Sequence, residues 1–221
     1  MSLPKQFLEC NGKPIIIYTL ELFDRHPQID GIVVACLASW IPYLESMLRR
    51  FEVSKVLKIV PGGETGQESI YHGLLAAEEL SDDETVVLIH DGVRPLIDAD
   101  VISRNIQCVK DNGNCITCVP ATETFMVRQD NGALEVPQRD RSLLARAPQS
   151  FFLKDIISAH RRAVAEGKND FIDSCTMMSH YGYQLSTIIG PVENIKITTP
   201  TDFYVFRALV ELRENQQIFG L

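Results

Sequence analysis

The chain has 221 residues, of which 45% are apolar and 23% charged, and its net charge is −8. This is ordinary composition for a globular protein, so we predict a single domain over residues 1–221 with a full hydrophobic core. The acidic balance argues against nucleic-acid binding. Because there is no signal-peptide pattern and no apolar run of about 18 residues, we expect a cytoplasmic protein that spans no membrane.

The first part of the chain alternates between helical and strand patterns. The spacing of apolar residues predicts helices over 13–25, 40–51, 68–80 and 99–110. Between them we expect strands over 31–37, 56–60, 85–90 and 114–119. Repeated alternation of this kind predicts an α/β fold with a doubly wound, mostly parallel sheet and helices on both of its faces.

The alternation breaks at a hairpin signal. Two short strand patterns flank Gln129-Asp130-Asn131-Gly132, a sequence typical of a tight turn. We expect a β-hairpin arm over about 122–138 that protrudes from the domain. Because an isolated two-stranded ribbon is marginally stable in water, its apolar side chains are expected to pack on a second subunit, which predicts a homodimer.

The remainder of the chain returns to mixed structure. We expect helices over 153–166 and 172–181, then strands over 185–189 and 195–198. The last helix is predicted to begin at Pro200, with Thr199 as its N-cap.

The segment 86–95 is the most informative stretch for function. Its apolar run predicts a strand buried on both faces, followed at once by His90-Asp91-Gly92-Val93-Arg94-Pro95. In open α/β sheets, ligands bind beyond the carboxyl ends of the strands. A carboxylate and a guanidinium at that place suit a metal-bound polyphosphate, with Asp91 facing the cation and Arg94 a phosphate. The alternative is a surface turn with a local ion pair.

A second candidate is the glycine-rich stretch 61–69. Its glycines allow close approach of a ligand, and free N–H groups at a helix start can meet an anion or the edge of a base. The stretch matches neither the P-loop nor the dinucleotide fingerprint, so a generic turn is the alternative. Basic residues also stand in predicted loops or at strand ends, where solvated charge is the alternative explanation: Lys5, Arg139, Arg141 and Lys196.

Five motifs follow one another in a fixed order. They are Pro4-Lys5-Gln6-Phe7-Leu8 with Gly12-Lys13-Pro14-Ile15, then Gly62-Gly63 to Ser69, His90 to Pro95, Pro148-Gln149-Ser150-Phe151, and Asn194-Ile195-Lys196-Ile197-Thr198. From Leu3 to about Phe206 the chain therefore resembles the polyol-phosphate cytidylyltransferases, which use methylerythritol 4-phosphate or ribitol 5-phosphate. The resemblance implies a nucleotidyltransferase that moves CMP from CTP to a polyol phosphate, with Mg²⁺ and release of pyrophosphate.

The resemblance also assigns roles to residues. It implies catalytic roles for Lys5, Lys196 and Asp91, and Asp91 is the implied metal ligand. The implied nucleotide-binding residues are Gly62, Gly63, Glu64, Ser69 and Gly92. The implied polyol-phosphate residues are Arg94, Thr124, Lys196 and one of Arg139 and Arg141; spacing from Pro148 favours Arg139, and spacing from Thr124 favours Arg141.

Departures from the family pattern favour ribitol 5-phosphate, with CDP-ribitol as the product. The usual arginine of the second glycine-rich loop is Gly66, and the usual Asp-Thr-x-Lys is Glu123-Thr124-Phe125-Met126. Methylerythritol 4-phosphate, of isoprenoid biosynthesis, is the alternative acceptor substrate. A nucleoside triphosphate with a base other than cytosine is the alternative donor.

The resemblance further implies a strand and a glycine-rich loop before the Pro-Lys-Gln motif, where only Met1 to Leu3 stand here. The alternative from another class is therefore a truncated, non-catalytic dimeric remnant.

Overall fold

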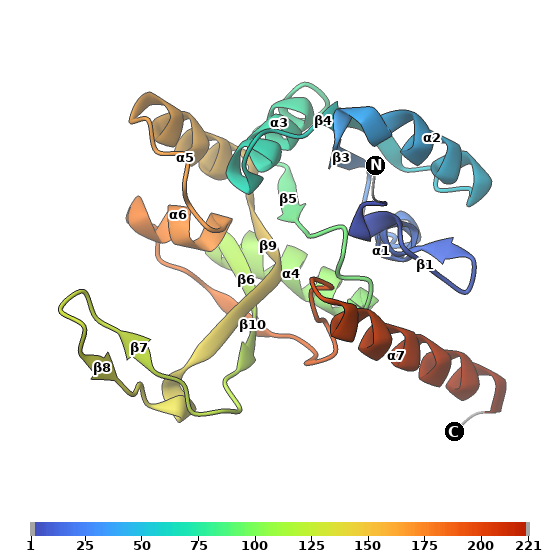
Figure 1. The fold of residues 1–221 in the computed structure, drawn as a ribbon. Coiled ribbons are helices and arrows are strands. Elements are labelled where there is room, and N and C mark those ends of the chain that lie inside the picture. Colours follow the sequence, from blue (N-terminus) through green and yellow to red (C-terminus); the bar gives the residue numbers. More distant parts are fainter. Residues whose placement is uncertain (1–2, 220–221) are drawn as a thin grey trace.

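A four-stranded mixed sheet and a separate parallel strand pair organise the fold, with helices packed around them (Figure 1). The computed structural model describes residues 3–219. The larger sheet has the order β10 (Thr187–Ile189), β6 (Asn114–Pro120), β9 (Leu143–Phe152) and β5 (Val86–Ile89). The pair consists of β3 (Ile32–Cys36) and β4 (Val56–Pro61).

The predicted α/β class is confirmed, and one strand makes the sheet mixed. β10 runs parallel to β6, and β3 parallel to β4, whereas β9 runs antiparallel to both β5 and β6. The sequence analysis did not predict β9 as a strand. Conversely, the strand expected over 195–198 does not form, since this segment joins no sheet in the structure.

The helices lie close to their predicted positions. They are α1 (Ile15–Asp24), α2 (Ile41–Arg50), α3 (Gly66–Glu78), α4 (Ala99–Asn112), α5 (Leu153–Ala165), α6 (Ser174–His180) and α7 (Pro200–Phe219). The start of the first predicted helix is corrected, because β2 (Lys13–Pro14) pairs there with β1 (Glu9–Cys10). Thr199 caps α7 as predicted, its Oγ1 accepting from the Asp202 N–H at 3.2 Å. None of the helices within residues 3–219 has the length and hydropathy to cross a membrane.

The predicted hairpin arm is present and projects away from the sheet (Figure 1). β7 (Val127–Arg128) pairs antiparallel with β8 (Leu134–Glu135). Gly132 adopts a φ of +83°, a conformation that glycine accepts without strain, and the Gln129 N–H donates to the Ala133 carbonyl at 2.8 Å. Apolar side chains remain exposed along the arm: Met126, Val127, Leu134 and Val136.

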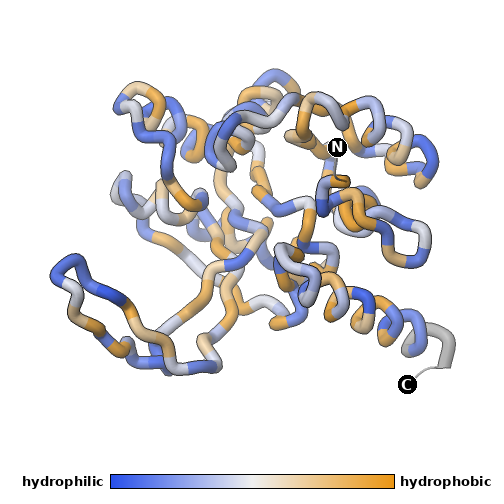
Figure 2. Tube along the Cα trace, viewed as in Figure 1, coloured by the Kyte–Doolittle hydropathy of each residue, from blue (hydrophilic) through white to orange (hydrophobic). Residues whose placement is uncertain are grey.

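Apolar residues gather along α1 and the central strands (Figure 2). Phe151 of β9 is fully buried in the cluster between the sheet, α3 and α5, together with Leu153 and Ile156. A polar contact crosses the other side of the sheet. Asn105 of α4 donates to Thr117 Oγ1 at 2.9 Å and accepts from Ser150 Oγ at 2.9 Å, and all three side chains are fully buried. The residues therefore hold α4 to β6 and β9 through satisfied hydrogen bonds.

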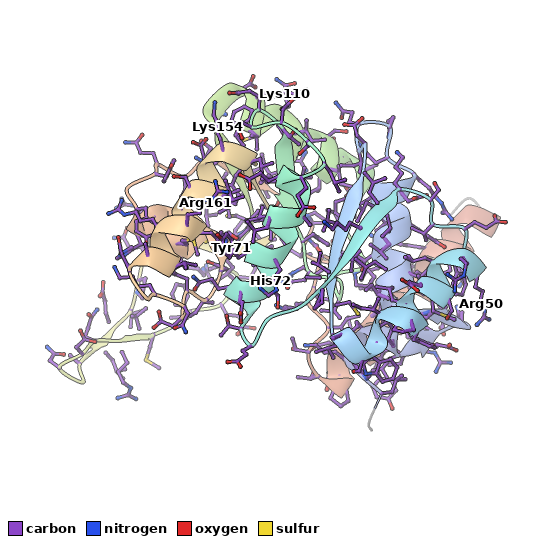
Figure 3. The ribbon with its side chains drawn as sticks, turned by 90° about the horizontal axis from the view of Figure 1, so that it is seen from above. Arg50, Tyr71, His72, Lys110, Lys154 and Arg161 are labelled. Carbon is purple, nitrogen blue, oxygen red and sulfur yellow. The ribbon has the colours of Figure 1, made fainter. Side chains whose placement is uncertain are left out.

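His160 of α5 is a buried titratable group outside the candidate site. Its ring stacks on Tyr71 of α3 with centroids 5.5 Å apart, and Figure 3 shows Tyr71 on the side of α3 nearest α5. Neither ring nitrogen has a hydrogen-bond partner among the described residues. Burial lowers the pKa of His160 to about 4.

We predict that His160 makes the protein less stable in acid. Below its ordinary pKa of 6.5 the unfolded chain takes up a proton that the folded chain accepts only near pH 4. The free energy of unfolding should therefore fall by up to about 3 kcal/mol between these pH values through this group. His160→Phe should flatten that part of the pH profile in urea unfolding. Equal slopes for wild type and His160→Phe would contradict the prediction.

Candidate active site

The turn after β5 carries the first two charged residues of the site. The Asp91 carboxylate accepts from Arg94 Nε at 2.8 Å, and the Arg94 N–H donates to the Asp91 carbonyl at 3.0 Å. His90 Nε2 lies 3.1 Å from the Arg94 carbonyl and closes the turn from the other side. Burial lowers the pKa of His90 to about 4, so at neutral pH this ring contacts the carbonyl as the neutral form, with Nε2 as donor.

Lys196 reaches the same carboxylate from the loop before α7. Its Nζ lies 2.7 Å from Asp91 Oδ1, and the neighbouring Ile197 N–H donates to the Val93 carbonyl at 2.9 Å. The backbone contact fixes the loop against the turn, and the ion pair connects their side chains. Two residues proposed from the sequence, Arg94 and Lys196, thus both contact a third, Asp91.

Electrostatics keep Asp91 ionised. Burial on its own would raise the pKa of this carboxyl, but the hydrogen bonds and charges of Lys196 and Arg94 outweigh it and lower the pKa below its ordinary value. A carboxylate held between two cations is therefore present throughout the neutral range.

Asn194 accepts hydrogen bonds from two arginine side chains near the site. Its carbonyl accepts from Arg94 Nη1 at 2.9 Å and from Arg146 Nη1 at 3.4 Å, and its side-chain Nδ2 donates to the Ala147 carbonyl at 2.7 Å. Because the Asn194 side chain is only 1% exposed, this bridge between β9 and the loop lies inside the protein. Arg94 is also buried, whereas Lys196 Nζ is at the surface side of the cluster, its side chain 44% exposed.

The glycine-rich loop lies at another strand end, between β4 and α3. Ser69 Oγ accepts from the Gly63 N–H at 3.0 Å and donates to the Thr65 carbonyl at 2.9 Å. The Glu64 N–H donates to the exposed Glu68 carboxylate at 2.6 Å. A Cβ on Gly63 would stand 2.3 Å from the Glu68 side chain, so this close approach requires glycine. Gly62 donates to the Cys36 carbonyl at 2.8 Å, which ties the loop to the end of β3.

The other predicted residues lie outside the Asp91 contacts. Lys5 is exposed on the 3-10 turn Lys5–Phe7, which is held by stacking of Phe7 on Trp40 with ring centroids 5.1 Å apart. The Gly92 carbonyl accepts from Thr19 Oγ1 at 3.2 Å, which connects the turn after β5 to α1.

The arm residues Thr124, Arg139 and Arg141 are exposed. Arg139 donates to the Thr122 carbonyl at 3.4 Å, within its own arm. No hydrogen bond or ion pair of the described residues connects these three to Asp91.

Sequence reasoning missed Arg146 and the bridging role of Asn194. A signal was available for Arg146, since it is the one charged residue in the apolar run Leu143-Leu144-Ala145-Arg146-Ala147. A half-buried charge in such a run is typical of a ligand-facing strand. The contact of the Asn194 carbonyl with two guanidinium groups has no sequence signal, because it depends on how three distant segments pack.

The number of acidic side chains at the site determines which metal ion it can bind. Among the described residues, no group of three or more His, Cys, Asp and Glu side chains could hold a metal ion. Asp91 stands as a single carboxylate beside cationic groups that suit phosphates. This donor set fits an ion such as Mg²⁺ that keeps several waters and binds one carboxylate together with substrate phosphates.

The chain matches known proteins over nearly its full length. The family model described as IspD, 2-C-methyl-D-erythritol 4-phosphate cytidylyltransferase, matches residues 1–212. The chain is 52% identical over 219 residues to a ribitol-5-phosphate cytidylyltransferase of Streptococcus agalactiae serotype V, which covers 99% of this chain and 91% of that protein. It is 37% identical to a 2-C-methyl-D-erythritol 4-phosphate cytidylyltransferase of Geobacter metallireducens, over 95% of this chain and 90% of that one.

Solved structures share the fold. The 4-diphosphocytidyl-2C-methyl-D-erythritol synthase of Anaerococcus prevotii superimposes with a TM-score of 0.83 at 24% identity, covering 95% of this chain and 91% of its own. The 2-C-methyl-D-erythritol 4-phosphate cytidylyltransferase of Francisella tularensis gives 0.77 at 27% identity, covering 95% and 93%. The family resemblance drawn from the five motifs is confirmed, and the chain belongs to the IspD family of cytidylyltransferases, which are nucleotidyltransferase enzymes.

Proposed function

We propose that the protein transfers CMP from CTP to ribitol 5-phosphate and releases pyrophosphate, giving CDP-ribitol in the cytoplasm. The observation that carries the substrate assignment is the 52% identity to ribitol-5-phosphate cytidylyltransferases of Streptococcus agalactiae, against 37% to a methylerythritol-phosphate relative. Gly66 and Met126, which replace the usual arginine and lysine of the family pattern, also favour ribitol 5-phosphate as the substrate.

The proposed reaction is a single displacement at phosphorus. A phosphate oxygen of the polyol phosphate attacks the α-phosphorus of CTP, and the bond from this phosphorus to the bridging oxygen breaks. Pyrophosphate leaves with the electron pair. Lys5 and Lys196 stabilise the charge that develops on the α-phosphate, and Arg94 and Lys196 hold the polyol phosphate, so catalysis is mainly positioning and charge neutralisation.

The glycine-rich loop is proposed to bind the nucleotide base. The Glu64 N–H is held by the exposed carboxylate of Glu68, which a ligand can displace at little cost. Cytosine carries acceptors at O2 and N3 that could take this N–H, and Ser69 Oγ supplies a further polar group next to Gly63. Gly62 and Gly92 have no side chains, so a ligand can approach the backbone closely at the ends of β4 and β5.

Enzymes of this family are generally metal-dependent. We propose Mg²⁺ as the ion, with Asp91 as its protein ligand and phosphate oxygens of CTP completing the shell. The ion supplies charge neutralisation for the triphosphate when bound. Chelation of divalent ions should abolish turnover, and adding Mg²⁺ back should restore it; turnover that persists in excess chelator would reject the metal.

The test of the function uses the full-length gene product with CTP and Mg²⁺. Pyrophosphate release is measured side by side with ribitol 5-phosphate and methylerythritol 4-phosphate, and the nucleotide product is identified by its mass. We expect CDP-ribitol and a clear preference for ribitol 5-phosphate. A preference for methylerythritol 4-phosphate would overturn the substrate, and no release with either would favour the non-catalytic alternative.

We also propose that the arm joins two subunits into a homodimer. Met126, Leu134 and Val136 are 64%, 54% and 58% exposed, so the hairpin leaves its apolar side chains uncovered within one chain. Exposed apolar side chains grouped on a protruding ribbon favour burial against another surface. The proposed consequence is that Thr124 and Arg139 or Arg141 act in the site of the neighbouring subunit.

Mixing two inactive variants tests this proposal. If the arm acts across the dimer, Lys196→Ala and Arg139→Ala subunits should complement each other, because one of the two sites of each mixed dimer contains only intact residues. Statistical mixing should restore about one quarter of wild-type turnover. A parallel mixture with Arg141→Ala identifies the functional arginine. A monomer by light scattering at micromolar concentration, or no recovery with either arginine variant, would contradict the proposal.

A further inference from the structure

Arg146 stands at the candidate site without a role in the family motifs. It lies on β9 between the exposed first residues and the buried later residues of the strand, and the residue is half-buried. Arg146 Nη1 and Arg94 Nη1 both donate to the carbonyl of Asn194, at 3.4 and 2.9 Å. Two guanidinium groups therefore converge on one neutral acceptor, although like charges repel.

The charges in this cluster do not balance. Asp91 is within ion-pair distance of both Arg94 and Lys196, and Arg146 forms no ion pair with a described residue. The cluster therefore contains three positive side chains, Arg94, Arg146 and Lys196, and one negative side chain, Asp91. Burial, and then the charge of Arg94, lower the pKa of Arg146, so holding this charge here costs free energy in the unliganded protein. Such a cost is typical of a site built for a ligand of opposite charge.

The excess of positive charge in the cluster indicates which kind of ligand would neutralise it. A phosphate monoester carries close to two negative charges near neutral pH, which would neutralise the cluster. A phosphate that bridges two other groups carries one. Guanidinium groups also present paired N–H donors that match phosphate oxygens.

We propose that Arg146 is a binding residue for the phosphate monoester of the acceptor substrate, acting together with Arg94 and Lys196. The proposal rests on the proposed transfer to a polyol phosphate, but it concerns phosphate binding and not the identity of the polyol. Arg146 then gives the acceptor phosphate a third cationic contact, which contributes to affinity for the acceptor and not for CTP.

The experiment compares wild type, Arg146→Leu and Arg146→Lys as full-length proteins. Calorimetry measures the dissociation constants of inorganic phosphate, ribitol 5-phosphate and CTP, and steady-state kinetics gives KM for each substrate. Arg161→Leu is the matched control, since Arg161 is exposed on α5 and pairs with Glu78 at 2.8 Å (Figure 3). Melting temperatures show that each variant is folded.

We expect Arg146→Leu to weaken binding of inorganic phosphate and ribitol 5-phosphate by about 10- to 100-fold, with little change for CTP. Arg146→Lys should recover part of the loss because it keeps the charge, and Arg161→Leu should bind like wild type. Unchanged phosphate binding in Arg146→Leu, or a loss confined to CTP, would overturn the proposal. If Arg146 proves necessary for phosphate binding while no CDP-ribitol forms, the inference stands and the proposed function fails.

Discussion

Lys196→Ala is expected to lower kcat by about 10²- to 10³-fold while the melting temperature stays near that of wild type. Lys196 Nζ lies 2.7 Å from Asp91 and carries one of the positive charges that the proposed site offers to phosphate. Losing one preorganised charge of this kind costs about 3–4 kcal/mol of transition-state stabilisation. Stability should change little, because the lysine side chain is 44% exposed and Asp91 keeps its contact with Arg94.

Asp91→Asn should cause a loss of similar size. The amide keeps the shape of the side chain but removes the charge that orients Arg94 and Lys196 and that is proposed to meet the metal. Turnover and melting temperature are measured on the same preparations. Lys154→Ala is the matched control, since Lys154, like Lys196, is an exposed lysine that forms an ion pair with one carboxylate, here that of Glu84. Near wild-type turnover in both site variants would show that the site lies elsewhere.

Asn105→Ala is expected to destabilise the protein by about 2–4 kcal/mol. The substitution leaves the hydroxyls of Thr117 and Ser150 buried without the amide that pairs them, and it opens a small cavity between α4 and the sheet. Urea unfolding with an unchanged m-value measures the loss. Replacing all three polar residues, as Asn105→Leu with Thr117→Val and Ser150→Ala, should recover part of it because no unpaired group then remains.

The exposed Asn112, on the same helix, provides the comparison for this prediction. Asn112→Ala should change the free energy of unfolding by less than about 0.5 kcal/mol. An Asn105→Ala variant as stable as Asn112→Ala would mean that the buried hydrogen bonds contribute nothing net.

Local patterns explain why much of the fold was predictable. Helices such as α3 and α4 carry apolar stripes and side-chain caps at Thr65 and Asp98, and the hairpin has its Asn-Gly turn. β9 was missed because Pro148 and Arg146 interrupt its apolar run, although the partners β5 and β6 hold it in the sheet. The error over 195–198 has the opposite cause. The alternating pattern there suits a strand. In the part of the chain that the structure describes, however, the Ile197 N–H makes a single backbone hydrogen bond to the turn after β5, at Val93, and the Thr198 N–H bonds to the Asp202 side chain of α7.

The candidate site was predictable where a motif concentrates charge in a few adjacent residues. Asp91 and Arg94 are neighbours in one turn, so their ion pair follows from the sequence. The approach of Lys196 came from the family resemblance, and the position of Arg146 depends on the packing of β9 against the Asn194 loop. Contacts between segments distant in sequence have no local pattern that reveals them.

The contact between the turn after β5 and the Asn194 loop has a consequence for protein synthesis. Arg94 and the Asn194 carbonyl to which it donates are 100 residues apart in sequence. The residues of the Lys196–Asp91 ion pair are 105 apart. While the chain emerges from the ribosome, the turn is made long before its lysine exists. A nascent chain stalled before Asn194 would hold Asp91 and Arg94 without Lys196, so it would lack one of the three cations of the proposed phosphate site. The proposed acceptor-phosphate site would therefore be complete only after translation has passed Lys196.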